Sequence, residues 1–91
     1  MLTIMTTIER SGFFRRLTAT VEGRFVGDWA TFAEREVEAL LEKRLPLVLE
    51  LSSVREIDAT GHEVLGRLAA HGIDVEGLPI TNDAGVALAR G

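Results

Sequence analysis

Cysteine is absent from the 91-residue chain, which excludes disulfide bonds, thiolate metal sites and cysteine nucleophiles. No apolar run approaches the ~20 residues that cross a bilayer, and the first residues lack the pattern of a signal peptide. Basic residues are outnumbered: 10 Lys and Arg against 14 Asp and Glu give a net charge of −4. This balance disfavours nucleic-acid binding and attachment to anionic membranes. We therefore expect a cytoplasmic protein that binds no nucleic acid and inserts into no membrane.

The composition is that of a folded chain, with 46% hydrophobic and 26% charged residues. Its length suits one domain over residues 1–91, with little room for a deep cavity inside its own core.

Two strands are predicted at the start of the chain. Residues 2–8 and 13–21 are rich in β-branched and apolar side chains, and a turn at residues 11–12 joins them into an antiparallel hairpin. In the second strand the odd-numbered residues, beginning with Phe13, form the better core face.

A helix is predicted from residue 29 to about residue 44. Asp28 is its expected N-cap, because a carboxylate can accept hydrogen bonds from the free N–H groups of a first helical turn. Trp29 and Phe32 lie on its apolar stripe, and we expect them to pack in the core. An acidic ridge, expected to face solvent, lies on another face of the helix and consists of Glu34, Glu38 and Glu42.

A buried strand is predicted over residues 47–51, where apolar residues run almost without interruption. A turn at Ser52-Ser53 follows it. A second helix is expected over residues 60–71, with Thr60 and Glu63 in the spacing of a capping box.

A short strand at residues 73–76 and a weak helix ending near Leu88 complete the chain. The order is β-β-α-β-α-β-α. We therefore predict an α/β fold with a mixed sheet, in which an N-terminal antiparallel hairpin is followed by parallel strands and flanked by helices.

Residues 47–65 resemble the signature of STAS domains, the family of anti-sigma-factor antagonists and their relatives. The family pattern is an apolar strand, a short loop, and Asp-Ser-Ser-Gly opening a helix; here it reads Asp58-Ala59-Thr60-Gly61. Residues 22–27 also resemble the Gly-Glu/Arg-Leu segment that precedes the first helix in the family. The resemblance extends over about residues 13–86 and implies a STAS-like fold and a partner-binding switch module.

The sequence departs from that family pattern at the site of regulation. The first Ser after the Asp is phosphorylated by a partner kinase in the antagonists, and here Ala59 has no hydroxyl group. Thr60 is the remaining candidate for phosphorylation. Glu50 replaces the more usual Asp at the end of the strand.

The predicted partner-binding segment is the start of the second helix, where unpaired N–H groups and a partial positive charge are exposed. It consists of Asp58, Ala59, Thr60, Gly61 and His62. The partner that the resemblance implies is an anti-sigma factor with serine-kinase ability or a similar regulator. A Gly61→Arg substitution is expected to abolish binding and leave the fold intact.

Two alternatives remain open at this point. A STAS-like accessory subunit of a transporter ATPase or signalling assembly would share the fold. A small-ligand-binding domain or enzyme would use Asp58, His62 and Glu63 beside a pocket.

The sequence offers little else for chemistry. It has no phosphate-binding glycine loop, no nucleophile elbow and no three-ligand cluster at zinc spacing. We therefore predict a non-enzymatic protein with no catalytic residues, no metal and no cofactor, present as a monomer or weak homodimer.

Overall fold

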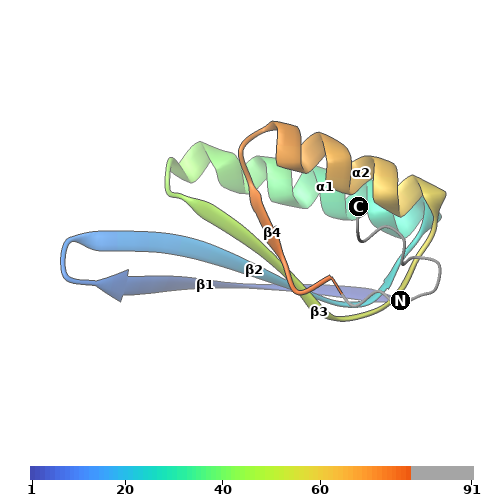
Figure 1. Ribbon diagram of the computed structural model, residues 1–91, viewed down its shortest axis with the longest axis horizontal. Coiled ribbons are helices and arrows are strands. Elements are labelled where there is room, and N and C mark those ends of the chain that lie inside the picture. Colours follow the sequence, from blue (N-terminus) through green and yellow to red (C-terminus); the bar gives the residue numbers. More distant parts are fainter. Residues whose placement is uncertain (79–91) are drawn as a thin grey trace.

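The chain begins with a long antiparallel hairpin, as predicted. In the computed structural model, which describes residues 1–78, strand β1 covers Leu2–Ser11 and β2 covers Phe14–Phe25. Gly12 sits in the turn with φ of 62°, a conformation that costs glycine little. The hairpin extends past the helices (Figure 1). Phe13 lies in its turn and is fully exposed, so the expectation that Phe13 faces the core is wrong.

Helix α1 covers Gly27–Leu40, and a 3₁₀ turn at Leu41–Lys43 follows it. The predicted helix to residue 44 therefore ends early, where Arg44 adopts a left-handed conformation with φ of 60°. Small residues face the sheet and allow a close approach: the buried residues of α1 are Ala30, Ala33 and Val37. The expectation that the two aromatic residues of α1 lie in the core is wrong, since Trp29 is 44% and Phe32 42% exposed.

The remaining elements are β3 at Leu47–Ile57, α2 at Ala59–Ala70 and β4 at Asp74–Glu76. Strand β3 continues well beyond the predicted end at residue 51, so the predicted turn at Ser52-Ser53 is wrong. Two shifts in the β2–β3 register, on either side of the Glu22–Gly23 pairs, allow β3 to keep pairing through these polar residues. The predicted helix ending near Leu88 lies outside the described residues.

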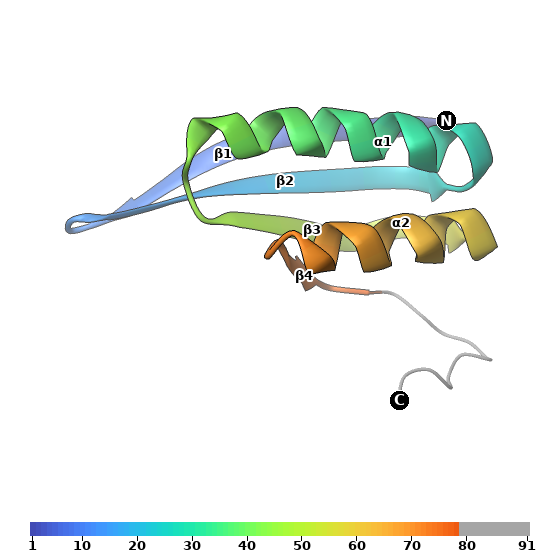
Figure 2. The ribbon, with the colours of Figure 1, turned by 90° about the horizontal axis from the view of Figure 1, so that it is seen from above.

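The sheet order is β1-β2-β3-β4, with β1 and β2 antiparallel and the other pairs parallel. The predicted α/β fold with a mixed sheet is therefore confirmed. Both crossovers advance in the same direction across the sheet, so both helices cover one face, and within residues 1–78 no element covers the other face (Figures 1 and 2). Neither helix among residues 1–78 is long and apolar enough to span a bilayer.

The core lies between the sheet and the two helices. Its largest fully buried side chains are Phe25, Leu49, Leu51, Leu68, Val21, Val37 and Val64. Val48 is also buried but lies outside this core cluster.

A forked ion pair joins the two helices side by side. Arg67 of α2 donates from Nε to Oε2 of Glu34 at 2.8 Å and from an Nη to Oε1 at 3.0 Å. The Glu34 side chain is only 13% exposed, so this part of the acidic ridge does not face solvent as predicted. The hydrogen bond from Arg67 holds the pKa of Glu34 below its ordinary value.

We expect Arg67→Ala to lower the melting temperature at neutral pH. The difference from the parent protein should shrink as the pH falls below about 4.5, because protonated Glu34 no longer attracts Arg67. The lowered pKa contributes stability above the unfolded value, and this contribution is lost as the pH falls through the native value. Calorimetry across pH 3–7 measures it, with the exposed Arg35→Ala as control; equal pH dependence in both variants would contradict the prediction.

Candidate functional site

One carboxylate connects the beginnings of both helices. Asp58 lies between β3 and α2, and its Oδ1 accepts a hydrogen bond from the backbone N–H of Gly61 at 2.8 Å. Its Oδ2 accepts from the N–H of Gly27, the first residue of α1, at 3.1 Å. Both N–H groups are among those that a helix cannot pair internally, and both helix dipoles favour a negative charge there. Asp58 therefore caps two helices at once.

This arrangement corrects two expectations about helix capping. The N-cap position of α1 is Val26, and Asp28 makes no capping hydrogen bond, because Asp58 supplies a carboxylate to that end. Helix α2 begins at Ala59 with Asp58 as its cap, so Thr60 and Glu63 do not form a capping box. Asp58 thus caps both helices, and its second partner, 31 residues away, had no sequence pattern to reveal it.

The predicted partner-binding segment is largely at the surface. Asp58, Ala59 and His62 are exposed, Thr60 is half-buried, and Gly61 is buried. The sharp turn expected after residue 51 is instead the change of direction at Asp58, after β3 has ended at Ile57. The exposed residues stand at the carboxyl end of β3, the edge of a parallel sheet where α/β proteins commonly bind their ligands.

Gly61 has a packing role inside the protein. A Cβ atom at this position would overlap the carbonyl oxygen of Phe25 and lie 2.9 Å from Cγ2 of Ile57. The absence of a side chain therefore lets α2 approach the end of β2 closely. The expectation that Gly61→Arg leaves the fold intact is wrong, because even the first carbon of an arginine side chain does not fit.

Glu50 occupies the position where the family pattern has Asp. Its Oε1 accepts hydrogen bonds from the hydroxyl of Ser52 at 2.6 Å and from the Ser52 N–H at 3.0 Å. These bonds lower the pKa of Glu50. Glu50 thus fixes the local course of β3 through its Oε1 atom.

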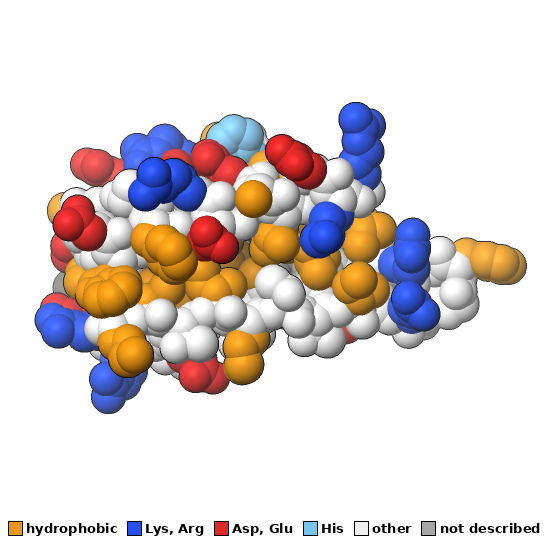
Figure 3. Space-filling view, turned by 180° about the vertical axis from the view of Figure 1, so that it is seen from behind, with side chains coloured by type: hydrophobic (Ala, Val, Ile, Leu, Met, Phe, Trp, Pro, Cys, Tyr) orange, Lys and Arg blue, Asp and Glu red, His pale blue; other side chains and the backbone are white. Residues whose placement is uncertain are grey.

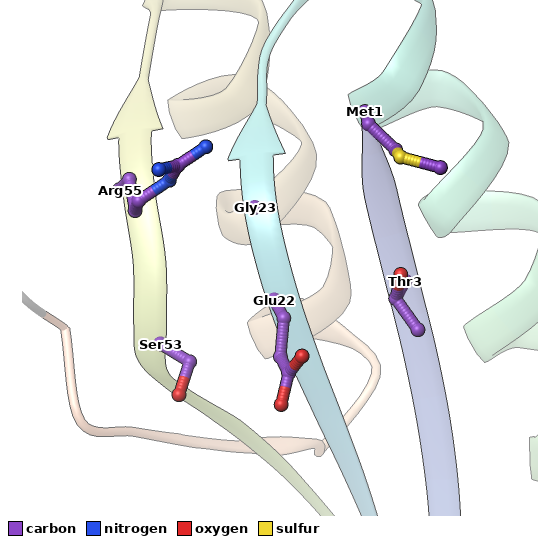
Figure 4. Close-up of a pocket in the computed structure, with 6 residues that line it drawn as sticks. All are labelled: Met1, Thr3, Glu22, Gly23, Ser53 and Arg55. Atoms are coloured by element: carbon purple, nitrogen blue, oxygen red, sulfur yellow. The ribbon is translucent and has the colours of Figure 1, made fainter.

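An open depression of about 430 Å³ lies on the uncovered face of the sheet (Figure 4). It is lined from β1, β2 and β3 and their ends by Met1, Thr3, Glu22, Gly23, Ser53 and Arg55. None of these residues belongs to the Asp58, His62 and Glu63 set, so the depression is not the pocket that the ligand-binding alternative requires. Within residues 1–78, no group of three or more His, Asp or Glu is placed to hold a metal ion.

Comparison with known proteins adds no relative. No family model, no curated protein and no solved structure matches the chain.

We expect Asp58→Ala to destabilise the protein by about 2 kcal/mol, because two helix ends lose their acceptor and a single N-cap is commonly worth about 1 kcal/mol. Asp28→Ala is the matched control, since Asp28 lies in the first turn of α1 without a capping bond, and it should cost less than about 0.5 kcal/mol. Urea unfolding measures both; equal losses would contradict the double cap.

The two glycines of α2 should respond oppositely to alanine. Gly61→Ala is expected to destabilise by more than about 2 kcal/mol, because the added methyl group overlaps the Phe25 backbone. Gly66→Ala meets nothing within 4 Å and should stabilise the helix by up to about 1 kcal/mol. Thermal denaturation of both variants checks this, and a neutral Gly61→Ala would show that Gly61 is not a packing residue.

Proposed function

We propose that this chain is a non-enzymatic, STAS-like regulatory module of the cytoplasm that binds another protein through the start of α2. The partner is an anti-sigma factor with serine-kinase ability or a similar regulator. The docking segment is Asp58, Ala59, Thr60 and His62, with Gly61 beneath them as a spacer. The single observation that carries the proposal is the Asp58 carboxylate that holds both helix ends and thereby fixes this exposed segment in place.

The electrostatics of the site favour a macromolecular partner over a small anion. A phosphate or carboxylate ligand at a helix start is attracted by free N–H groups. Here the N–H groups of Gly27 and Gly61 already donate to Asp58, and the negative charge of Asp58 repels a second anion. The atoms that remain for contact are the exposed side chains of Ala59 and His62.

Docking at this segment does not depend on phosphorylation of the usual residue. Ala59 offers no hydroxyl group, and Thr60, the other candidate acceptor, is half-buried. We therefore propose that the parent protein binds its partner constitutively, with phosphorylation of Thr60 as the alternative means of control. A phosphate on Thr60 would add about −1.5 to −2 charges beside the carboxylate of Asp58. Repulsion between these two negative groups would disturb the docking segment and so weaken the binding of the partner.

Two exposed alanines of α2 provide a matched test. Ala59→Arg places a long cation in the docking segment, whereas Ala70→Arg places the same side chain at the other end of the helix. With purified anti-sigma factors of the source genome as probes, isothermal titration calorimetry should show at least tenfold weaker binding for Ala59→Arg. Ala70→Arg should stay within about twofold of the parent affinity.

The outcomes separate the alternatives. Equal affinity of the two variants for a bound anti-sigma factor would place the contact elsewhere and overturn the docking segment. Absence of binding by every anti-sigma factor, together with binding to a transporter ATPase subunit that Ala59→Arg abolishes, would retain the segment and replace the partner.

A further inference from the structure

The outer edge of β1 has no strand beside it among the described residues, and its first part, residues 2–8, carries none of the usual protections. Residues 2–8 of this edge contain no charged residue, proline or glycine. Exposed edges of this length are normally interrupted by charges, proline or bulges, because their free N–H and C=O groups attract further strands. β1 pairs with β2 without a register shift over its whole length, so no bulge interrupts this edge.

The hydrogen-bonding pattern shows which residues point outward. The N–H of Arg24 donates to the carbonyl of Met1 at 2.9 Å, and these two residues continue by one step the register that begins with Leu2 opposite Gly23. Odd-numbered residues of β1 therefore exchange hydrogen bonds with β2. The even-numbered residues direct their N–H and C=O groups away from the sheet, and these are Leu2, Ile4, Thr6, Ile8 and Arg10.

The side chains of the same even-numbered residues face the helix layer, since Ile4 lies opposite Val21 and Ile8 opposite Leu17 in the core. Ile8 is nevertheless 45% exposed. Helix α1 contributes a second exposed apolar surface beside these β1 side chains.

Helical geometry places that surface on the β1 side of α1. Residues 32 and 34 lie about 100° to either side of residue 33, which faces the sheet. Glu34 bonds to Arg67 of α2, so Phe32 lies on the opposite flank, above β1, with Trp29 next to it. Ile4, Ile8, Trp29 and Phe32 therefore form one apolar band. Figure 3 shows hydrophobic side chains gathered on one face of the molecule.

The two ends of the apolar band carry opposite charges. Arg10 continues the even-numbered row of β1 toward the hairpin turn. Asp28 lies at the start of α1, which follows the end of β2 and therefore adjoins the start of β1. Neither residue forms an ion pair within residues 1–78. An antiparallel copy would bring the basic end of one band to the acidic end of the other.

We propose that two copies of this chain associate through antiparallel pairing of their β1 edges into a continuous eight-stranded sheet. The two-fold axis passes beside Thr6, so that Ile4 of each copy lies opposite Ile8 of the other and Arg10 lies opposite Leu2, beneath the second copy's Trp29. The outward N–H and C=O groups of the even-numbered residues in one copy then face the same groups of the other copy along the whole contact. Arg10 gains a cation–π contact with the indole ring and attraction to Asp28.

The available surface is large enough for a stable dimer. The molecule measures 40 by 26 Å along its two longer axes, so the face that carries β1 has room for the about 800 Å² per partner of a standard interface. Two α1 helices placed over β2 would stand about 14 Å apart across the paired β1 strands, wider than the 8–10 Å of direct helix packing. The rings of Trp29 and Phe32 fill that space. The start of α2 stays free, so this proposal does not rest on the docking function.

Light scattering coupled to size exclusion tests the association. The parent chain should elute at twice its 9.9 kDa mass and dissociate on dilution. Thr6→Pro removes an outward N–H and no bond to β2, so it should give a folded monomer by circular dichroism. Trp29→Lys should also give a monomer, while Phe13→Lys, an exposed aromatic in the hairpin turn outside the paired residues, should remain dimeric.

The absence of native cysteine allows a direct test of the register. Under mild oxidation Thr6→Cys should form a disulfide-linked dimer, and Thr18→Cys on the inner strand β2 should not. A monomeric parent chain, an assembly larger than a dimer, or an unlinked Thr6→Cys would each overturn the proposal. So would loss of the dimer in Phe13→Lys, because it would point to non-specific association of exposed aromatic residues.

Discussion

The Asp58 carboxylate is the contact on which the arrangement of this protein depends, because it ends β3, begins α2 and holds α1 in the same place. Each of its oxygens accepts a backbone N–H from a different helix. With the forked Glu34–Arg67 ion pair farther along, the helices are joined at two levels and act as one layer above the sheet. The side chains just after Asp58 are therefore presented from a fixed position, which is the property that a protein-docking segment requires.

The arrangement of the helices also explains why the β1 edge and the aromatic residues of α1 are exposed. Two successive crossovers that advance in one direction put both helices on one face, and the strand order of residues 1–78 leaves β1 at an edge with no described neighbour on its outer side. Helix α1 uses its alanines to approach the sheet and turns its aromatic residues outward, toward that edge. The exposure of Trp29 and Phe32 thus follows from the position of α1, and it is the basis for the proposed association through this side of the molecule.

The two proposed contacts lie on different parts of the fold and do not compete. The docking segment is at the carboxyl end of β3, next to the start of both helices. The β1 edge and the apolar band run along the far side of α1. A dimer would therefore present two docking segments, each at the start of its own α2, and bivalent binding to a dimeric regulator would strengthen association beyond that of one site.

The sequence by itself determined the kind and order of the described elements. Alternating and continuous apolar runs mark the strands and Gly12 marks the hairpin turn, because each of these is a local effect of backbone geometry. The parallel pairing of β3 with β2 followed from the helix between them.

Only the tertiary structure decided which residues each element buries and which distant atoms it meets. The helical stripe was compatible with Trp29 and Phe32 facing inward. In the structure the neighbouring alanines face the sheet instead, since only small side chains allow α1 to approach the sheet closely. The cap of α1 came from Asp58, 31 residues away, and not from the adjacent Asp28. The extension of β3 beyond residue 51 came from pairing with β2. Contacts between residues far apart in the chain depend on how whole elements pack, and local sequence patterns do not contain that information.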